Sequence, residues 1–476
     1  MTTPITRIYA VFALLFGALV FATSSSTVFR SKSLNDNALN KRGVLEAARV
    51  KRGVIRAGDG SILAQSQRER GGTYHRRYPA GPLFAHSVGY SFTDIGQAGL
   101  ERTYNDPLIG KRTGINSIFD QLEGRSKEGD DLSLTLDPKV QRTAQDALRS
   151  AGNGRGAVVA LDPHTGAVKA LVSEPSYDPN DLDARGRFAQ LNRDASSPVF
   201  NRATQSSYPP GSTFKVVTDI AAIDSGRYRP DSVVSGRNGK TISGVPLQND
   251  NGEDFGAIDL TTALTHSVNT VWAEVALNVG QATMGRYMTR LGFYARPPLD
   301  YPAGQRQPSG EFDSARLLDP LSRLIDVGRM GIGQDKLAVT PLQMAMVAAA
   351  VANDGLLIKP HLGARIVDRD GRLVDNVRPA RQSRVMKSST ARAVGQMMSQ
   401  VVREGTGTAA ALSGIQVAGK TGTAEIGGCA GNQAWFIAFA PVEKPKVAVA
   451  ATVECANGTG GEVAAPIAKQ VMEALL

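Results

Sequence analysis

The sequence predicts a mixed α+β (or α/β) chain with two globular domains and a short apolar appendage at its N-terminus. Its 476 residues exceed the usual size of one domain, and 42% apolar residues suffice for a sizeable core. Residues 30–150 show the pattern of short strands and turns, whereas residues 151–476 mix strands with helices. We therefore expect a cytoplasmic tip and anchor at 1–29, a β-rich domain at 30–150 and a larger domain at 151–476.

The appendage is an almost wholly apolar run from Ile8 to Phe21 that follows Arg7, which indicates an export element. The residues that come next are compatible with two outcomes. Ala22-Thr23-Ser24 has the small-x-small pattern of a signal-peptidase site, whereas the apolar residues up to Phe29 would extend a retained membrane anchor. With either outcome, we expect the rest of the chain outside the cytoplasm.

Positive charge gathers just after this run. The chain carries a net charge of +10, and most of the excess lies between Arg30 and Arg77. The positive-inside rule would keep such a segment in the cytoplasm, but that rule weakens for long exported domains. We interpret the segment as a basic surface near anionic lipid or wall polymer, and we do not expect nucleic acid as a partner.

The first domain is predicted to consist mainly of short strands. Gly58-Asp59-Gly60 lies between two short apolar runs, which predicts a β-hairpin over residues 52–64. Residues 132–136 alternate like a strand, and Asp137 is predicted to cap a helix over 138–148. No catalytic cluster is apparent in this part of the sequence.

The larger domain is predicted to contain an antiparallel sheet. A hairpin over 157–172 opens it, and three further strands are joined by short connections, which favour antiparallel neighbours. These three predicted strands are 416–424, 434–440 and 446–453. Thr340-Pro341 predicts the start of a helix so apolar on all sides that it should be buried, and residues 464–476 predict a closing helix on the sheet.

The stretch Tyr208-Pro209-Pro210-Gly211-Ser212-Thr213-Phe214-Lys215 is the first chemical signal. Two prolines and a glycine block a helix upstream, and the apolar residues that follow predict a helix beginning at or near Ser212. Residues three apart share a helix face, so Lys215 can reach the Ser212 hydroxyl and act as its base. Alone this S-x-x-K pattern is weak, because a capping serine and a surface lysine produce it by chance.

Two further motifs reverse that judgement. Ser267-Val268-Asn269 and Lys420-Thr421-Gly422-Thr423 follow in the chain order of the motif set found in β-lactamases and penicillin-binding proteins. The first follows a short helix that Asp259 is predicted to cap. The second lies on the predicted strand 416–424, where Gly422 would let a ligand backbone approach closely.

The chain therefore resembles a class B penicillin-binding protein, a peptidoglycan D,D-transpeptidase, and is most similar to the actinobacterial penicillin-binding protein A group. The resemblance covers nearly the whole chain and implies a pedestal or dimerisation domain, a catalytic antiparallel sheet with helices on both faces, and a retained single-pass anchor with the catalytic domain on the outer face of the cell membrane. Further stretches that carry it are Arg52-Gly53-x-Ile55, Gly99-Leu100-Glu101, Asn201-Arg202-Ala203, Gly331-x-Gly333-Gln334 and Glu404-Gly405-Thr406-Gly407.

The resemblance also implies a role for each motif residue. Ser212 would attack the penultimate D-Ala carbonyl of a D-Ala-D-Ala stem peptide, and Lys215, its pKa lowered by burial and positive neighbours, would accept the proton. Ser267, between Lys215 and Lys420, would relay a proton to the departing D-Ala. The backbone N–H groups of Ser212 and Thr423 would hold the oxyanion.

The remaining motif residues would bind substrate. Asn269 would hold the substrate amide, and Thr421 and Thr423, with Lys420, would hold the terminal carboxylate. Penicillin and other β-lactams would acylate the same serine. No cofactor or metal is expected, because the sequence has no cofactor motif and its histidines lack metal-ligand spacing. A separate glycosyltransferase is the expected protein partner.

Three other activities of this fold stay open: a β-lactamase, a D,D-carboxypeptidase and a non-catalytic β-lactam sensor. A class A β-lactamase needs a glutamate in an E-x-x-x-N pattern after the second motif, and Glu311 lacks that asparagine. A sensor would usually carry several membrane segments. A carboxypeptidase shares the three motifs, so only the pedestal elements around Arg52 and Glu101 distinguish a transpeptidase from it.

The two cysteines, Cys429 and Cys455, are predicted to form a disulfide. Export permits one, and both cysteines follow strands that should run parallel with one strand between them. Two free thiols are the alternative, because loop ends this far apart need not meet.

Overall fold

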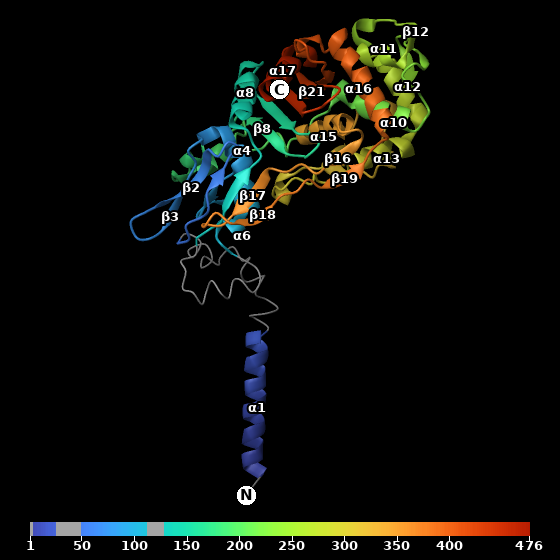
Figure 1. Ribbon diagram of the computed structural model, residues 1–476. Helices are drawn as coiled ribbons and strands as arrows, with labels where there is room; N and C mark the ends of the chain where they lie inside the picture. The colour runs from blue at the N-terminus through green and yellow to red at the C-terminus, as the bar shows by residue number, and fades with distance from the viewer. Residues whose placement is uncertain (1–2, 25–48, 112–127) are drawn as a thin grey trace.

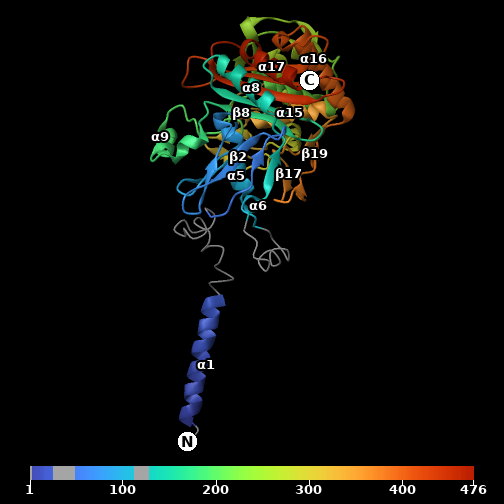
Figure 2. The same cartoon turned by 60° about the vertical axis from the view of Figure 1, so that its left-hand side comes forward.

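The computed structural model describes residues 3–24, 49–111 and 128–476, and it contains two main sheets, of which the one with β8 and β21 lies among helices (Figure 1). Helix α1 (Thr3–Ser24) stands apart from both sheets (Figure 2), and large apolar side chains along it, such as Phe12 and Leu14, are exposed. Within the described ranges, no helix is long and apolar enough to cross a membrane. The predicted anchor residues 25–29 and the start of the basic segment lie outside those ranges.

The larger sheet has five antiparallel strands in the order β20-β21-β22-β7-β8. The strands are β7 (Gly156–Leu161), β8 (Val168–Glu174), β20 (Ala418–Glu425), β21 (Asn432–Ala440) and β22 (Val447–Ala456). They correspond to the predicted hairpin and to the three predicted closing strands, so the antiparallel sheet is confirmed. β20 forms one edge of this sheet.

Helices cover both faces of the larger sheet. Val158 and Ala160 of β7 belong to one buried cluster, and Val159 and Leu161 belong to another. Successive strand residues point to opposite faces, so an apolar strand of this kind must be covered on both sides. The covering helices are α8 (Pro138–Ser150) and α17 (Ala465–Leu475) on one face, and α15 (Pro341–Ala352) and α16 (Ser388–Arg403) on the other.

A further group of helices packs beside α16 and carries two of the three motifs (Figure 1). Its members are α10 (Lys215–Asp224), α11 (Leu260–Thr265), α12 (Asn269–Val279), α13 (Gln281–Arg290) and α14 (Val327–Gly331). The predicted caps form: Asp259 accepts from the Thr262 N–H, and Thr340 accepts from the Gln343 N–H at the start of the wholly buried α15.

The smaller sheet has six strands, but they contain fewer residues in total than the five strands of the larger sheet; it belongs to the N-terminal domain and has the strand order β18-β17-β6-β1-β2-β3. Its strands are β1 (Ile55–Arg56), β2 (Ile62–Arg68), β3 (Tyr74–Arg77), β6 (Asp131–Leu134), β17 (Gly363–Val367) and β18 (Leu373–Asn376). The predicted hairpin of β1 and β2 is confirmed. β17 pairs with β6 although the paired residues Ser133 and Arg365 are 232 apart in the chain, while α8 packs on the larger sheet. The smaller sheet is thus built from segments on either side of residue 150, and the larger sheet, whose strands all follow that residue, is covered by a helix that precedes it.

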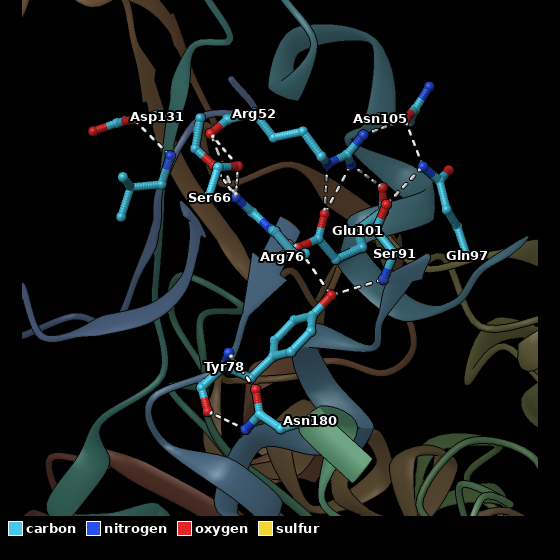
Figure 3. A network of polar contacts seen from close by, with 12 residues as sticks. Arg52, Ser66, Arg76, Tyr78, Ser91, Gln97, Glu101, Asn105, Asp131 and Asn180 are labelled. Carbon is cyan, nitrogen blue, oxygen red and sulfur yellow. Dashed lines mark hydrogen bonds and ion pairs between the residues drawn. The ribbon is translucent and has the colours of Figure 1, made fainter. Parts of the chain in front are cut away.

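Two arginines share one buried carboxylate in the N-terminal domain (Figure 3). Arg52 Nη2 lies 2.8 Å from Glu101 Oε2, and Arg76 Nε lies 2.5 Å from Glu101 Oε1. Burial alone would raise the pKa of Glu101, but the two guanidinium groups outweigh burial and lower it. Nearby, the Asn180 side chain bonds both backbone groups of Tyr78, which joins this domain to the chain that follows β8.

Candidate active site

Ser212 lies in a short 3-10 turn, Gly211–Phe214, and α10 begins only at Lys215. The prediction of a helix near Ser212 is therefore correct in place, but its first turn is tighter than an α-helix. Gly211 has a φ of +53°, and a Cβ there would lie 2.7 Å from the Thr423 carbonyl oxygen. Only glycine permits this approach, which sets the Ser212 turn directly against β20.

Hydrogen bonds donated by three side chains hold the segment that precedes this turn. The Tyr208 hydroxyl donates to Glu454 Oε1 at 2.5 Å, and Arg202 Nε donates to the same oxygen at 2.9 Å. The indole N–H of Trp435 donates to the Pro209 carbonyl at 3.0 Å. These bonds tie the Tyr208-Pro209 segment to β21 and β22, so the position of Ser212 is set by the larger sheet.

Lys215 is fully buried one turn after Ser212. Its Nζ donates to the Ser267 carbonyl at 2.5 Å, to the Asn269 Oδ1 at 2.6 Å and to the Ser267 hydroxyl at 3.1 Å. Among the described residues, no hydrogen bond joins Lys215 to the Ser212 hydroxyl. Burial, opposed by the charge of Asp250, lowers the pKa of Lys215 to about 7.

Ser267, in the second motif, is the point at which all three motifs meet. Its hydroxyl oxygen accepts from Lys215 Nζ at 3.1 Å and from Lys420 Nζ at 2.9 Å. Burial, and then the Lys215 charge, lower the pKa of Lys420 well below its usual value. Ser267 has a φ of +59°, which is strained for a residue with a side chain and is typical of functional sites.

Asn269 begins α12 and faces Lys215 with its oxygen. Its Nδ2 donates at 3.1 Å both to the Gln248 carbonyl and to Asp250 Oδ1. Both amide protons are therefore engaged, and in this arrangement Asn269 orients the lysine. The sequence offered no functional signal for Asp250, because it lies in an Asn-Asp-Asn-Gly run that indicates only a turn.

The third motif lies along the edge strand β20. The Thr421 hydroxyl is 2.6 Å from the Thr406 hydroxyl, and the Thr423 hydroxyl accepts from the Gly460 N–H at 3.1 Å. A Cβ on Gly422 would lie 2.6 Å from the Pro210 carbonyl oxygen. Gly422 is thus required by the chain's own Ser212 segment, and not only for the approach of a ligand.

The structure also locates Glu311 and the two cysteines, for which there are expectations from the sequence. Glu311 is buried on β13 (Gly310–Asp313), where it accepts from the Tyr294 hydroxyl at 2.6 Å, and burial raises its pKa. This position provides no exposed carboxylate for activating water. Cys429 and Cys455 are bonded, which confirms the predicted disulfide.

The comparisons with known proteins agree with this geometry. The penicillin-binding protein transpeptidase domain matches residues 156–473, and the penicillin-binding protein A dimerisation domain matches residues 52–132. The first match spans more than half of the chain. The chain therefore belongs to the penicillin-binding protein transpeptidase family.

Relatives that match nearly the whole chain include PbpA and penicillin-binding protein A of mycobacteria. The chain is 34% identical to the peptidoglycan D,D-transpeptidase PbpA of Mycolicibacterium smegmatis, over 100% of this chain and 99% of the relative. The ceftriaxone acyl-enzyme complex of M. tuberculosis penicillin-binding protein A has a TM-score of 0.82 at 32% identity, covering 91% of this chain and 100% of that one. Its penicillin G acyl-enzyme complex has a TM-score of 0.79 at 32% identity, covering 89% and 99%.

Proposed function

We propose that this chain is a penicillin-sensitive D,D-transpeptidase that cross-links peptidoglycan stem peptides through an acyl-enzyme at Ser212. The observation that carries the proposal is the Ser267 hydroxyl, held between Lys215 and Lys420 beside the Ser212 turn. Two comparisons support it. The M. smegmatis relative is named a peptidoglycan D,D-transpeptidase, and the M. tuberculosis structures are acyl-enzymes formed with β-lactams.

In the first half-reaction, Ser212 Oγ bonds to the carbonyl carbon of the penultimate D-Ala, and the amide C–N bond to the last D-Ala breaks. With a pKa of about 7, a substantial fraction of Lys215 is neutral near pH 7 and can take the serine proton. Ser267 Oγ bonds the Lys215 amine and would pass this proton on to the departing D-Ala amine. Lys420 keeps the Ser267 hydroxyl in place during the transfer.

Substrate binding would use the edge of the larger sheet. Because β20 is an edge strand, an extended stem peptide can add to it by backbone hydrogen bonds. The backbone N–H groups of Ser212 and Thr423 would stabilise the oxyanion. Lys420, with the Thr421 and Thr423 hydroxyls, would bind the terminal carboxylate, while the Asn269 oxygen would accept from the substrate amide as well as from Lys215.

In the second half-reaction, an amine from a neighbouring stem attacks the acyl carbonyl, and Ser212 leaves with its proton restored. Water in place of the amine would make the chain a D,D-carboxypeptidase, and rapid loss of a penicilloyl group would make it a β-lactamase. The buried position of Glu311 against Tyr294 favours a long-lived penicilloyl adduct. The match to the dimerisation domain favours the transpeptidase over the carboxypeptidase.

The proposal includes a domain division and a location. Residues 1–29 would form a retained single-pass anchor, 30–150 the pedestal and 151–476 the transpeptidase domain on the outer face of the cell membrane. The exposed apolar side chains along α1 support membrane attachment, because an exposed apolar surface of this extent is typical of a membrane or protein interaction site. A separate glycosyltransferase would supply the glycan strands whose stems are cross-linked.

The test is a reconstituted cross-linking reaction. The purified protein is incubated with lipid-linked disaccharide pentapeptide and a glycosyltransferase, and the digested product is analysed for cross-linked dimers and released D-Ala. We expect dimers with the wild type, and none with Ser212→Ala or after penicillin treatment. Release of D-Ala without dimers would establish the carboxypeptidase, and dimers formed by Ser212→Ala would refute the proposal.

A further inference from the structure

Asp250 lies outside the three motifs but is attached to the start of α12. It begins the short turn Asp250–Gly252, between β11 (Val245–Leu247) and β12 (Ala257–Asp259). The neighbouring Asn249 is buried, and its Oδ1 accepts at 3.0 Å from both the backbone N–H and the hydroxyl of Thr270. The turn is therefore joined to the first turn of α12, one residue after Asn269.

Asn249 also closes its own turn. Its Nδ2 donates to the Gly236 carbonyl at 3.0 Å and to the Glu253 carbonyl at 2.9 Å. All four hydrogen bonds of this amide are thus made within the protein, which fixes the backbone around Asp250. Asp250 itself is exposed to solvent, yet its carboxylate has a defined place beside Asn269.

The partners of Asn269 determine which way its amide points. A carboxylate and a backbone carbonyl only accept hydrogen bonds, so the side facing Asp250 and Gln248 must be the NH₂ group. The oxygen is then directed at Lys215 Nζ, 2.6 Å away. If the Asn269 amide were reversed, its oxygen would face two hydrogen-bond acceptors, the Gln248 carbonyl and the Asp250 carboxylate. Its NH₂ group would then face the Lys215 amine, which is itself a donor.

Asp250 also acts on the two buried amines through its charge. It is the one acidic group whose charge raises the pKa of both Lys215 and Lys420 within the described chain, opposing burial in each case. The other titratable groups around Lys215 are Lys420, which meets it at Ser267, and Asp219 one turn along α10, where burial raises the pKa well above its usual value and so favours the neutral carboxyl.

We propose that Asp250 is a positioning residue for the acyl transfer, because it locks the Asn269 amide so that its oxygen holds Lys215 beside Ser267. The inference deepens the proposed function and rests on acylation of Ser212. Asp250 touches Asn269 and not the reacting atoms. It acts in two separable ways, through the hydrogen bond it accepts and through its negative charge.

Two substitutions separate these effects. Asp250→Asn keeps an acceptor oxygen for Asn269 but removes the charge, and Asp250→Ala removes both. The matched control is Asp254→Ala, since Asp254 is another exposed acid of the same loop, and its carboxylate bonds the Gly256 N–H and no other group in the described part of the chain. The measurement is the rate of Ser212 acylation by a fluorescent penicillin from pH 5 to 9, with thermal melting to verify the fold.

We expect the wild-type rate to fall on the acid side with a midpoint near pH 7, where Lys215 becomes protonated. Without the Asp250 charge the protonated lysine is less favoured, so the midpoint moves to lower pH in both Asp250 variants. The plateau rate should fall about tenfold in Asp250→Ala through misplacement of Lys215, and should be largely restored in Asp250→Asn. Asp254→Ala should match the wild type in both quantities.

Wild-type plateau rate and midpoint in Asp250→Ala would overturn the inference, as would an equal loss in Asp254→Ala. A lowered plateau without any movement of the midpoint would also overturn it, because a general loosening of the loop explains that result. A failure of the proposed function can be told apart from a failure of this inference. In that case fluorescent penicillin would label Ser212→Ala, or it would leave the wild type unlabelled.

Discussion

The Tyr104 hydroxyl donates to Asp300 Oδ2 at 2.6 Å, and this bond joins the N-terminal domain to a segment 196 residues further along the chain. The same carboxylate accepts from the backbone N–H groups of Leu362 and Gly363, both at 2.7 Å. Asp300 thus secures the point at which the chain enters β17 and returns to the smaller sheet.

This arrangement predicts a graded loss of stability. Asp300→Ala leaves two backbone donors and one hydroxyl without their acceptor and should lower the free energy of unfolding by about 3 kcal/mol. Tyr104→Phe removes only one bond and should cost about 1 kcal/mol. Urea unfolding of both variants is the measurement, and an Asp300→Ala protein no less stable than Tyr104→Phe would contradict the prediction.

Two glycines with left-handed backbones provide a test of how Ser212 is positioned. Gly333 has a φ of +81°, and a Cβ there would lie 1.9 Å from the Gly211 carbonyl oxygen. Gly226 has a φ of +77°, but a Cβ there would meet nothing within 4 Å. Gly226→Ala should therefore cost only the backbone strain of about 1 kcal/mol, whereas Gly333→Ala should also displace the Ser212 turn.

The measurement is penicillin labelling of both alanine variants, with thermal melting as the control for folding. We expect Gly226→Ala to be labelled at the wild-type rate and Gly333→Ala at least about tenfold more slowly. Equal labelling of the two variants would show that the contact between Gly333 and Gly211 does not position the nucleophile.

The bond between Cys429 and Cys455 predicts a redox-dependent stability. The two residues are 26 apart, so closing this loop should stabilise the fold by about 3.5 kcal/mol through the entropy of the unfolded chain. Reduction with a phosphine should lower the melting temperature of the wild type to that of a Cys429→Ser, Cys455→Ser double variant. The double variant itself should not respond to the reductant, and alkylation of both thiols in unreduced, denatured wild type would refute the bridge.

The penicilloyl adduct at Ser212 is expected to persist for hours. Glu311 is buried against Tyr294, so it cannot activate a water for deacylation, and Glu311→Gln should leave the adduct lifetime unchanged. Intact-mass spectrometry after a brief penicillin pulse follows the adduct in both proteins. Rapid return to the unmodified mass would favour the hydrolase, and a longer lifetime in Glu311→Gln would assign the glutamate to deacylation.

Much of this fold could be predicted from local pattern. Asp137, Asp259 and Thr340 cap the helices that their sequence context predicts, because capping depends on backbone groups within three residues. The strands of the larger sheet follow from apolar runs and short turns. β17 and β18 were not predicted. β18 is wholly exposed and has no apolar alternation, and β17 pairs with β6, which lies far away in the chain.

The sequence by itself determined the three motifs, their order and the elements that carry them, because these depend on residue type and spacing. Only the tertiary structure decided what the motif residues contact. Lys215 and Ser267 are 52 residues apart, and Lys420 and Ser267 are 153 apart. Nothing local in the chain specifies that these amines meet at one hydroxyl, or that Asp250 orients Asn269. Those contacts exist because α10, α12 and β20 pack together, and packing depends on the whole core.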